Sequence, residues 1–240
     1  MKKGLGVLGV AGKTPFAYVG QRSLTLFDEH PTIEVRALVA DDPADVGKTL
    51  AEAVEGRWLL DEPVPEHWQG IRLVGATKGE LEGAGVDFVL SALPGPHARQ
   101  ADPALAALGF PVVSESAGLR MDADVPLLVP DINADHLGIL SAQKQARGYD
   151  RGFLVACPLC TAVIYAITLR PLSERFGVDR SVVTTMQALS GAGRTGVPAL
   201  DVVDNILPLI PDEEEKLYAE TAKILGSYAN GRIEPWAAPI

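Results

Sequence analysis

Apolar residues in the first part of the chain fall into short runs separated by helical patterns. Residues 32–42 alternate apolar and polar side chains, which predicts a strand. Residues 4–12 and 86–94 are mostly apolar, as expected for parallel strands that are covered on both faces. Residues 101–110 have the pattern of a short helix, and residues 111–117 that of another strand. Strands that alternate with helices predict a doubly wound α/β sheet.

The pattern changes near residue 151. Residues 161–177 are apolar on most faces of a helix, which predicts a buried helix. The β-branched residues between 181 and 191 favour a long strand. Residues 198–210 and 212–226 have two further helical patterns, and the second ends at a glycine, as a helix often does.

The length of 240 residues allows one large domain or two small ones. We predict a Rossmann-like, doubly wound domain over residues 1–150 and an incomplete α+β domain over residues 151–240. The net charge of −10 argues against a nucleic-acid partner, because binding to phosphates needs a basic face. A small anionic substrate is compatible with this charge, since a local basic pocket can lie within an acidic protein.

The N-terminal segment, MKKGLGVLGVAGK, combines lysines with an apolar run. Glycines interrupt this run and no convincing cleavage site follows, so we do not expect a signal peptide. No stretch of the sequence approaches the roughly 18 apolar residues of a membrane-spanning helix. We expect a cytoplasmic protein with no membrane partner.

Three glycines, Gly6, Gly9 and Gly12, accompany the first predicted strand and its turn. Glycines here let the backbone approach a pyrophosphate, while the next helix supplies unpaired N–H groups. A plain tight turn is the alternative, and the strand–helix–strand context favours the cofactor site. Residues 13–18, which include Pro15, separate the glycines from the next helix and predict a long phosphate loop.

Asp41 and Asp42 follow the second predicted strand. A carboxylate at this point accepts hydrogen bonds from the hydroxyls of an adenosine ribose, which favours NAD. The 2′-phosphate of NADP would be repelled here. A solvated acidic turn is the alternative interpretation.

Cys157 and Cys160, the two cysteines of the chain, form a C-x-x-C pair in ACPLCTA. Three interpretations fit such a pair: a redox couple, half of a metal site, or one catalytic thiol with a neighbour. Two cysteines cannot complete a four-cysteine zinc site within one chain, and no histidine spacing completes a mixed site, so we predict no metal. Pro158 suits the first turn of a helix, which would place Cys160 where unpaired N–H groups stabilise a thiolate.

Several longer motifs resemble the aspartate-β-semialdehyde dehydrogenase family, especially its archaeal and fungal branch. The matching stretches include VVSESAGLRMDADVPLLVPDIN, CPLCT, TMQALSGAG, GVPALDVVDNILPLIPDEEEK and ETAKILG. Together with the N-terminal motifs they cover nearly the whole chain. The resemblance implies NAD(P)H-dependent reduction of an acyl phosphate, aspartyl-4-phosphate or a relative. It also implies a dinucleotide-binding domain followed by a catalytic and dimerisation domain.

The same resemblance implies roles for individual residues. Cys160 would attack the acyl phosphate, and hydride would reduce the resulting thioester. Gln187 would position the substrate and Glu214 would bind its amino group, while Arg120 and Lys216 would bind phosphate as a fork and a point charge. A plain surface charge is the alternative for each charged residue. The turns expected to face the cofactor are Ser91, Ala92, Leu93 and Pro94, and Gly191 with Gly193.

The sequence departs from the family around the nucleophile. The usual Asn-Pro-Asn-Cys is replaced by Cys-Pro-Leu-Cys, so Cys157 and Leu159 stand where asparagines could hydrogen-bond an oxyanion. Loss of one such donor typically costs roughly a hundredfold in turnover. Glu115 stands at another asparagine position, and residues 41–44 replace the side chains that contact a 2′-phosphate. Both NADP and NAD therefore stay open as cofactors.

In the family, a strand with a substrate-binding arginine and the catalytic histidine follows the KILG motif. This sequence ends fourteen residues after Gly226, and we expect a C-terminally shortened chain. Of its four histidines, we expect only His97 near a cofactor. A sheet without its last strands has an open edge and an apolar face, so we expect a homo-oligomer or a complementing partner protein.

Two other functions stay open beside the dehydrogenase. The replaced asparagines and the absent histidine favour a non-catalytic relative that binds a nucleotide or a partner. The cysteine pair favours thiol–disulfide chemistry, with Cys157 attacking or resolving.

Overall fold

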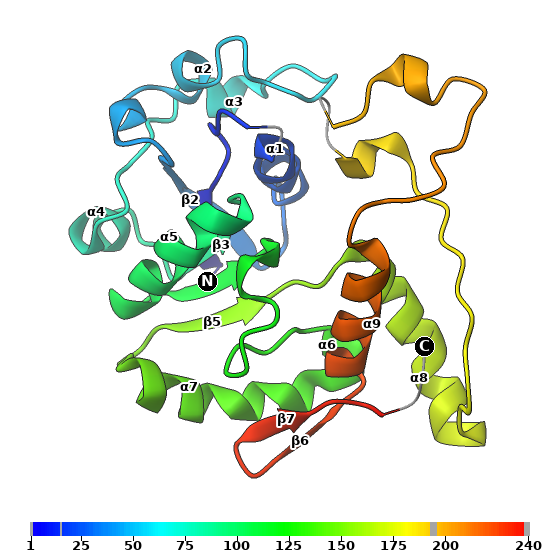
Figure 1. Cartoon of the computed structure of the whole chain (residues 1–240). Helices are drawn as coiled ribbons and strands as arrows, with labels where there is room; N and C mark the ends of the chain where they lie inside the picture. Colours follow the sequence, from blue (N-terminus) through cyan, green and yellow to red (C-terminus); the bar gives the residue numbers. More distant parts are fainter. Residues whose placement is uncertain (1, 15, 193–195, 238–240) are drawn as a thin grey trace.

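A central sheet and an adjoining pair of helices organise the chain in the computed structural model, which describes residues 2–14, 16–192 and 196–237 (Figure 1). The strands are β1 (Lys3–Leu8), β2 (Ile33–Val39), β3 (Phe88–Ser91), β4 (Pro111–Ser114), β5 (Phe153–Ala156), β6 (Ser227–Ala229) and β7 (Arg232–Glu234). The α-helices are α1 (Ala17–Leu26), α2 (Leu50–Ala53), α3 (Glu66–Gln69), α4 (Lys78–Gly83), α5 (Gly95–Ala107), α6 (Pro130–Asn133), α7 (Leu140–Arg147), α8 (Cys160–Phe176) and α9 (Glu213–Ile224). The 3-10 helices are η1 (Pro43–Asp45), η2 (Ala117–Leu119), η3 (Ala134–Ile139), η4 (Leu189–Ala192) and η5 (Ala199–Asp201).

The central sheet is parallel, with its strands in the order β2-β1-β3-β4-β5. β1 lies between β2 and β3, so the direction of winding reverses there and a crevice opens at the carboxyl ends of these strands. Val74, which belongs to no strand, forms an isolated parallel bridge with Val39 at the end of β2. The predicted α/β class with a doubly wound sheet is confirmed.

The sheet continues past residue 150. β5 pairs with β4 from Pro111 opposite Phe153 to Ser114 opposite Ala156. The last strand of the sheet therefore leads directly into the segment with both cysteines. The division into residues 1–150 and 151–240 stays a prediction.

Both faces of the sheet are buried. Along β3, Val89 belongs to one apolar cluster and Leu90 to the other, because successive side chains of a strand point to opposite faces. Leu105 of α5 and Ile224 of α9 contribute to the first cluster, and Leu24 of α1 to the second. Helices on both faces explain why the strands are apolar runs in the sequence.

The turn after β1 depends on glycine. Gly9 has a φ of 102°, and a Cβ at this position would lie 2.6 Å from the carbonyl oxygen of Ala92. A Cβ on Gly20 of α1 would lie 2.5 Å from the carbonyl oxygen of Gly9, so the helix packs directly on the turn. α1 begins at Ala17, two residues before the start that the sequence pattern indicates. Pro15 lies outside the described residues.

α8 and α9 lie side by side in the C-terminal part (Figure 1). They confirm the helices predicted over residues 161–177 and 212–226. The antiparallel hairpin of β6 and β7 follows α9.

Residues 181–188 have no regular secondary structure, so the strand predicted over residues 181–191 is wrong. β-branched residues favour extended backbone, but a strand also needs a partner, and no strand of the described residues pairs with this segment. The helix predicted over residues 198–210 is reduced to η5. Several apolar side chains between residues 181 and 210 are exposed, with Val182 at 90% and Met186 at 97% exposure.

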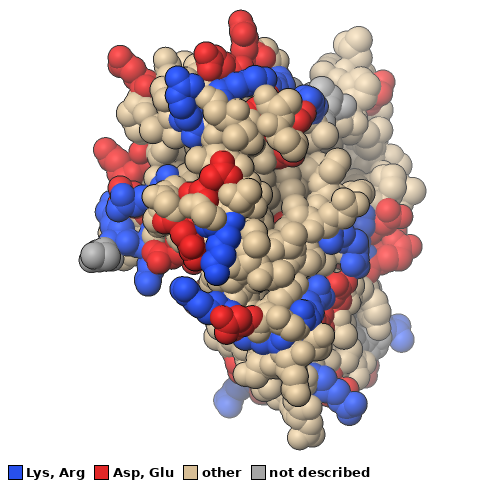
Figure 2. Space-filling model, turned by 90° about the vertical axis from the view of Figure 1, so that its left-hand side faces the viewer, with Lys and Arg blue, Asp and Glu red and all other residues tan. Residues whose placement is uncertain are grey.

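On the face shown in Figure 2, Lys and Arg side chains are interspersed with Asp and Glu side chains. Within the described part of the chain, no helix combines the length and the apolar character needed to cross a membrane.

Candidate active site

A cleft of about 550 Å³ lies beyond the carboxyl ends of β1, β2 and β3. The turn after β1, the turn after β2 and the start of α5 line it. Ligands of doubly wound sheets bind at this edge. The lining residues are Ala11, Gly12, Lys13, Thr14, Asp41, Asp42, Pro43, Leu93, Pro94, His97, Gln100 and Ala101.

Four of the predicted cofactor residues therefore line the cleft: Gly12, Asp41, Leu93 and Pro94. His97, the histidine expected near a cofactor, lines it as well. These residues come from three separate segments, the turns after β1 and β2 and the connection from β3 into α5, which the parallel sheet brings to one edge.

Other predicted cofactor residues are not among those that line the cleft. Gly6 lies within β1 and packs against side chains of the core. Ser91 and Ala92 are buried at the end of β3. Gly191 is exposed in η4, and Gly193 lies outside the described residues.

Charged side chains shape one side of the cleft. The Lys13 ammonium lies 2.6 Å from Asp42 Oδ2 and lowers the pKa of that carboxyl. Burial raises the pKa of Asp41, and its Oδ1 has no hydrogen-bond partner among the described residues. A buried acceptor without a partner fits a ligand that brings hydroxyl donors, so the residues present fit the ribose of a dinucleotide.

Cys160 is the first residue of α8, and its side chain is exposed. Leu159 is the N-cap, so Pro158 precedes the helix instead of lying in its first turn. The first N–H groups of a helix have no intrahelical partner, and the helix dipole favours negative charge there. Cys160 thus occupies a position suited to a thiolate nucleophile.

Cys157 has different surroundings. It is partly buried, and its N–H donates to the carbonyl oxygen of Ser114 at 2.8 Å. Burial, reinforced by the carboxylate of Glu115, raises the pKa of the Cys157 thiol to about 12. Cys157 is therefore a protonated thiol at neutral pH, which disfavours a redox pair in which it attacks.

Two carboxylates of α9 hold both neighbours of Cys160. Glu220 Oε2 accepts a hydrogen bond from the backbone N–H of Leu159 at 2.6 Å. Glu213 Oε1 accepts one from Thr161 Oγ1 at 2.8 Å. Positions 213 and 220 lie two turns apart on one face of the helix. The start of α8 is thereby fixed against α9 on both sides of the thiol.

Arg120 is buried and joins the same arrangement. Its Nη1 donates to Glu220 Oε1 at 3.0 Å, and its Nη2 donates to the carbonyl oxygen of Glu115 at 3.1 Å. Its Nε has no partner among the described residues. Through Glu220, the arginine predicted to bind phosphate is connected to the loop before Cys160.

Gln187 also lies in this region. Its Nε2 donates to Glu213 Oε1 at 2.6 Å. Glu214, the carboxylate predicted to bind the substrate, is exposed, and Glu213 is the one that contacts Gln187. Lys216 is exposed with its Nζ 3.5 Å from Asp212. The predicted roles of Gln187, Glu214 and Lys216 stay predictions.

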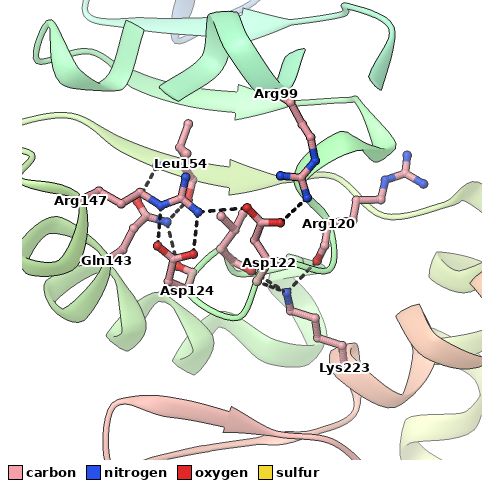
Figure 3. Close-up of polar contacts among 9 residues, drawn as sticks. Arg99, Arg120, Asp122, Asp124, Gln143, Arg147, Leu154 and Lys223 are labelled. Carbon is pink, nitrogen blue, oxygen red and sulfur yellow. Dashed lines mark hydrogen bonds and ion pairs between the residues drawn. The ribbon is translucent and has the colours of Figure 1, made fainter. Parts of the chain in front are cut away.

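Lys223 of α9 fastens the loop that follows Arg120. Its Nζ donates to the carbonyl oxygens of Arg120, Asp122 and Val125 at 2.6, 2.8 and 2.7 Å (Figure 3). Burial lowers the pKa of this lysine to about 8. Helix α9, which also anchors the two neighbours of Cys160, thus holds the backbone that follows Arg120.

Two arginines hold the same loop from the other side. Arg147 of α7 donates to Asp124 Oδ1 at 2.7 Å and to Asp122 Oδ2 at 3.1 Å (Figure 3). Arg99 of α5 donates to Asp122 Oδ1 at 2.7 Å. Three helices therefore fix the loop of residues 120–125, and with it the position of Arg120.

Sequence reasoning missed Glu213, Glu220 and Lys223. One signal was available, because positions 213, 216 and 220 share one face of a predicted helix and carry charges. The partners of these charges lie far away in the sequence, so spacing alone does not identify them.

Residues 5–139 match the semialdehyde dehydrogenase NAD binding domain, and residues 169–236 match the semialdehyde dehydrogenase dimerisation domain. The aspartate-semialdehyde dehydrogenase of Archaeoglobus fulgidus is 38% identical over 234 residues, which cover 98% of this chain and 64% of the relative. That of Methanothermobacter thermautotrophicus is 36% identical over 231 residues, which cover 96% of this chain and 63% of the relative. The chain spans less than two thirds of the length of either relative.

A solved structure agrees with these sequence relatives. The aspartate semialdehyde dehydrogenase from Candida albicans, determined with NADP, gives a TM-score of 0.81 at 34% identity, with 98% of this chain and 64% of that chain covered. The resemblance indicated by the motifs is confirmed. With one domain match covering more than half of its residues and a second covering much of the remainder, the chain belongs to the semialdehyde dehydrogenase family.

Proposed function

We propose that this chain acts as an aspartate-semialdehyde dehydrogenase, with Cys160 as its nucleophile and NAD(P)H as its reductant. One observation carries the proposal: an exposed thiol begins α8, and α9 anchors the residues before and after it. This thiol and the dinucleotide-type cleft belong to one fold whose relatives carry that activity.

The Cys160 thiolate attacks the carbonyl carbon of aspartyl-4-phosphate. A C–S bond forms, the bond from the carbonyl carbon to the phosphate oxygen breaks, and phosphate leaves with the electron pair. When bound, NAD(P)H would supply a hydride to the thioester carbon. The C–S bond then breaks with its electron pair on sulfur, which releases the semialdehyde and restores the Cys160 thiolate. Free N–H groups at the start of α8 stabilise the oxyanion, a role that the side chain of Leu159 cannot take.

Charged residues of α9 and the loop after β4 would bind the substrate. Arg120 and Lys216 would receive the phosphate group. Glu213, which contacts Gln187, is better placed than the exposed Glu214 to receive the substrate's amino group. The carboxylate and the amide would then position the substrate together.

The reverse reaction tests the proposal. With aspartate semialdehyde, phosphate and NAD(P)⁺, the chain should produce reduced cofactor, measured by its absorbance. Cys160→Ser should abolish this production, while the matched control Cys157→Ser should retain it. Production of reduced cofactor by Cys160→Ser would contradict the assignment of Cys160 as the nucleophile. Cofactor binding without any reduction by the wild type would favour a non-catalytic relative.

We also infer that the chain is cytoplasmic and works as a homo-oligomer or with a complementing partner. The dimerisation-domain match supports association with a second chain, as do large exposed apolar side chains on α8 and the segment that follows it. Light scattering should give a mass above that of one chain. The exposed side chains include Ile164, Phe176, Val182, Met186, Leu200 and Ile206.

A further inference from the structure

The acidic turn after β2 borders the same cleft as the glycine turn after β1. Asp41 and Asp42 line the cleft together with Gly12 and Lys13. A Cβ on Gly12 would lie 2.8 Å from Asp41 Oδ2, so a side chain at Gly12 would press on this carboxylate. In a doubly wound fold, the residues after the second strand meet the adenosine ribose of a dinucleotide.

The cations near this turn are already paired with carboxylates. Lys13 lies 2.6 Å from Asp42, and Lys48 lies 2.6 Å from Asp45. Arg57 lies 3.4 Å from the other oxygen of Asp45. A phosphate at this place would have to displace a carboxylate from each cation that it recruits.

Asp41 Oδ1, by contrast, lacks a hydrogen-bond donor within the described part of the chain. Its Oδ1 is buried, and no group of the described residues donates a hydrogen bond to it. A buried acceptor without a donor costs free energy, and two vicinal hydroxyls of a ribose would supply donors. A phosphate dianion supplies only acceptors and negative charge, so it worsens both the desolvation and the repulsion.

We propose that Asp41, with the Lys13–Asp42 ion pair, selects NAD(H) over NADP(H). This inference rests on the proposed function, because it names the cofactor of that same site. Asp41 accepts hydrogen bonds from the ribose hydroxyls. Asp42 pairs with the Lys13 ammonium and so keeps it from binding a 2′-phosphate.

Binding of each reduced cofactor to the full 240-residue chain tests the inference. Nicotinamide fluorescence without substrate gives the dissociation constants of NADH and NADPH. NADH should bind at least about tenfold more tightly, since like charges placed together are strongly unfavourable. Calorimetry with ADP-ribose and 2′-phospho-ADP-ribose should give the same order, because the adenosine end carries the discrimination.

Two variants and a control locate the cause. Asp41→Asn removes the buried charge, and Asp42→Asn removes a charge and releases Lys13, so each should bring the two affinities closer. Asp61→Asn, at an exposed aspartate outside the lining of the cleft, should leave the ratio unchanged. Equal or tighter binding of NADPH by the wild type, or a ratio that neither cleft variant moves, overturns the inference alone. Binding of neither cofactor overturns the proposed function as well.

Discussion

Glu220 accepts a hydrogen bond from the backbone N–H of Leu159 at 2.6 Å, across 61 positions of sequence. The same buried carboxylate pairs with Arg120 through its other oxygen. One side chain of α9 thus connects the N-cap of the nucleophile helix to the arginine predicted to bind phosphate. The position of Cys160 relative to Arg120 depends on this carboxylate.

Replacing Glu220 with alanine should therefore lower the free energy of unfolding and change the reactivity of Cys160. The change leaves the Arg120 guanidinium buried without its charged partner, which typically costs about 3 kcal/mol of unfolding free energy. It also leaves the Leu159 N–H unpaired, so the start of α8 loses one anchor. Denaturant unfolding measures the first effect, and the rate of Cys160 alkylation measures the second.

Two controls accompany this variant. Glu215→Ala, at an exposed glutamate of the same helix, should change neither quantity. The double variant Arg120→Met with Glu220→Met removes both charges, and it should recover stability without restoring the anchor on Leu159. Full stability of Glu220→Ala would show that the pair does not hold the helix.

The fold was accessible from the sequence because its sheet obeys local rules. The apolar runs around Val89 and Val112 mark strands buried on both faces, and helical patterns between such runs predict parallel pairing. The cleft followed from the same logic, since Gly12 and Asp41 come directly after strands that end at one edge.

Features that depend on distant partners were not accessible. Glu213 and Glu220 contact Thr161 and Leu159 through helix packing, which spacing along the chain does not reveal. The β-branched residues between 181 and 191 predicted a strand, but their side chains cannot determine whether another strand lies beside them. Local propensity indicated a conformation there, and tertiary structure decided the element.

The two thiols should react very differently. At pH 8, iodoacetamide should modify the exposed Cys160 of the folded chain at least roughly a hundredfold faster than Cys157, whose pKa of about 12 leaves little thiolate. Peptide mass spectrometry over time gives both rates. In denaturant the difference should disappear, since burial causes it. Comparable rates in the folded chain would contradict this account and revive the redox pair.

The carboxylate that binds the substrate can be identified by comparing neighbours on α9. Glu213→Gln removes the charge that faces Gln187 and Thr161, and it should lower kcat/KM by roughly tenfold or more, as expected for a charged hydrogen bond. Glu214→Gln changes an exposed side chain and should have little effect. A larger loss in Glu214→Gln would instead support the assignment made from the family resemblance.

Lys223 should make stability depend on alkaline pH. Burial lowers its pKa to about 8 in the folded chain, below the ordinary value of 10.5 that it recovers on unfolding. Between these values the unfolded chain binds more protons, so the unfolding free energy rises with pH. Relative to Lys223→Met, the wild type should gain on the order of 2 kcal/mol from pH 8 to 10.5.

Lys78→Met, at an exposed lysine, supplies the matched control for Lys223 and should track the wild type at every pH. Lys223→Met also loses the donors to the carbonyl oxygens of Arg120, Asp122 and Val125, so it should be less stable throughout. The pH slope separates the two effects, because those hydrogen bonds shift the whole curve while the titration changes its gradient. A constant difference between wild type and Lys223→Met from pH 8 to 10.5 would mean that the three carbonyl oxygens fully offset the burial of the ammonium.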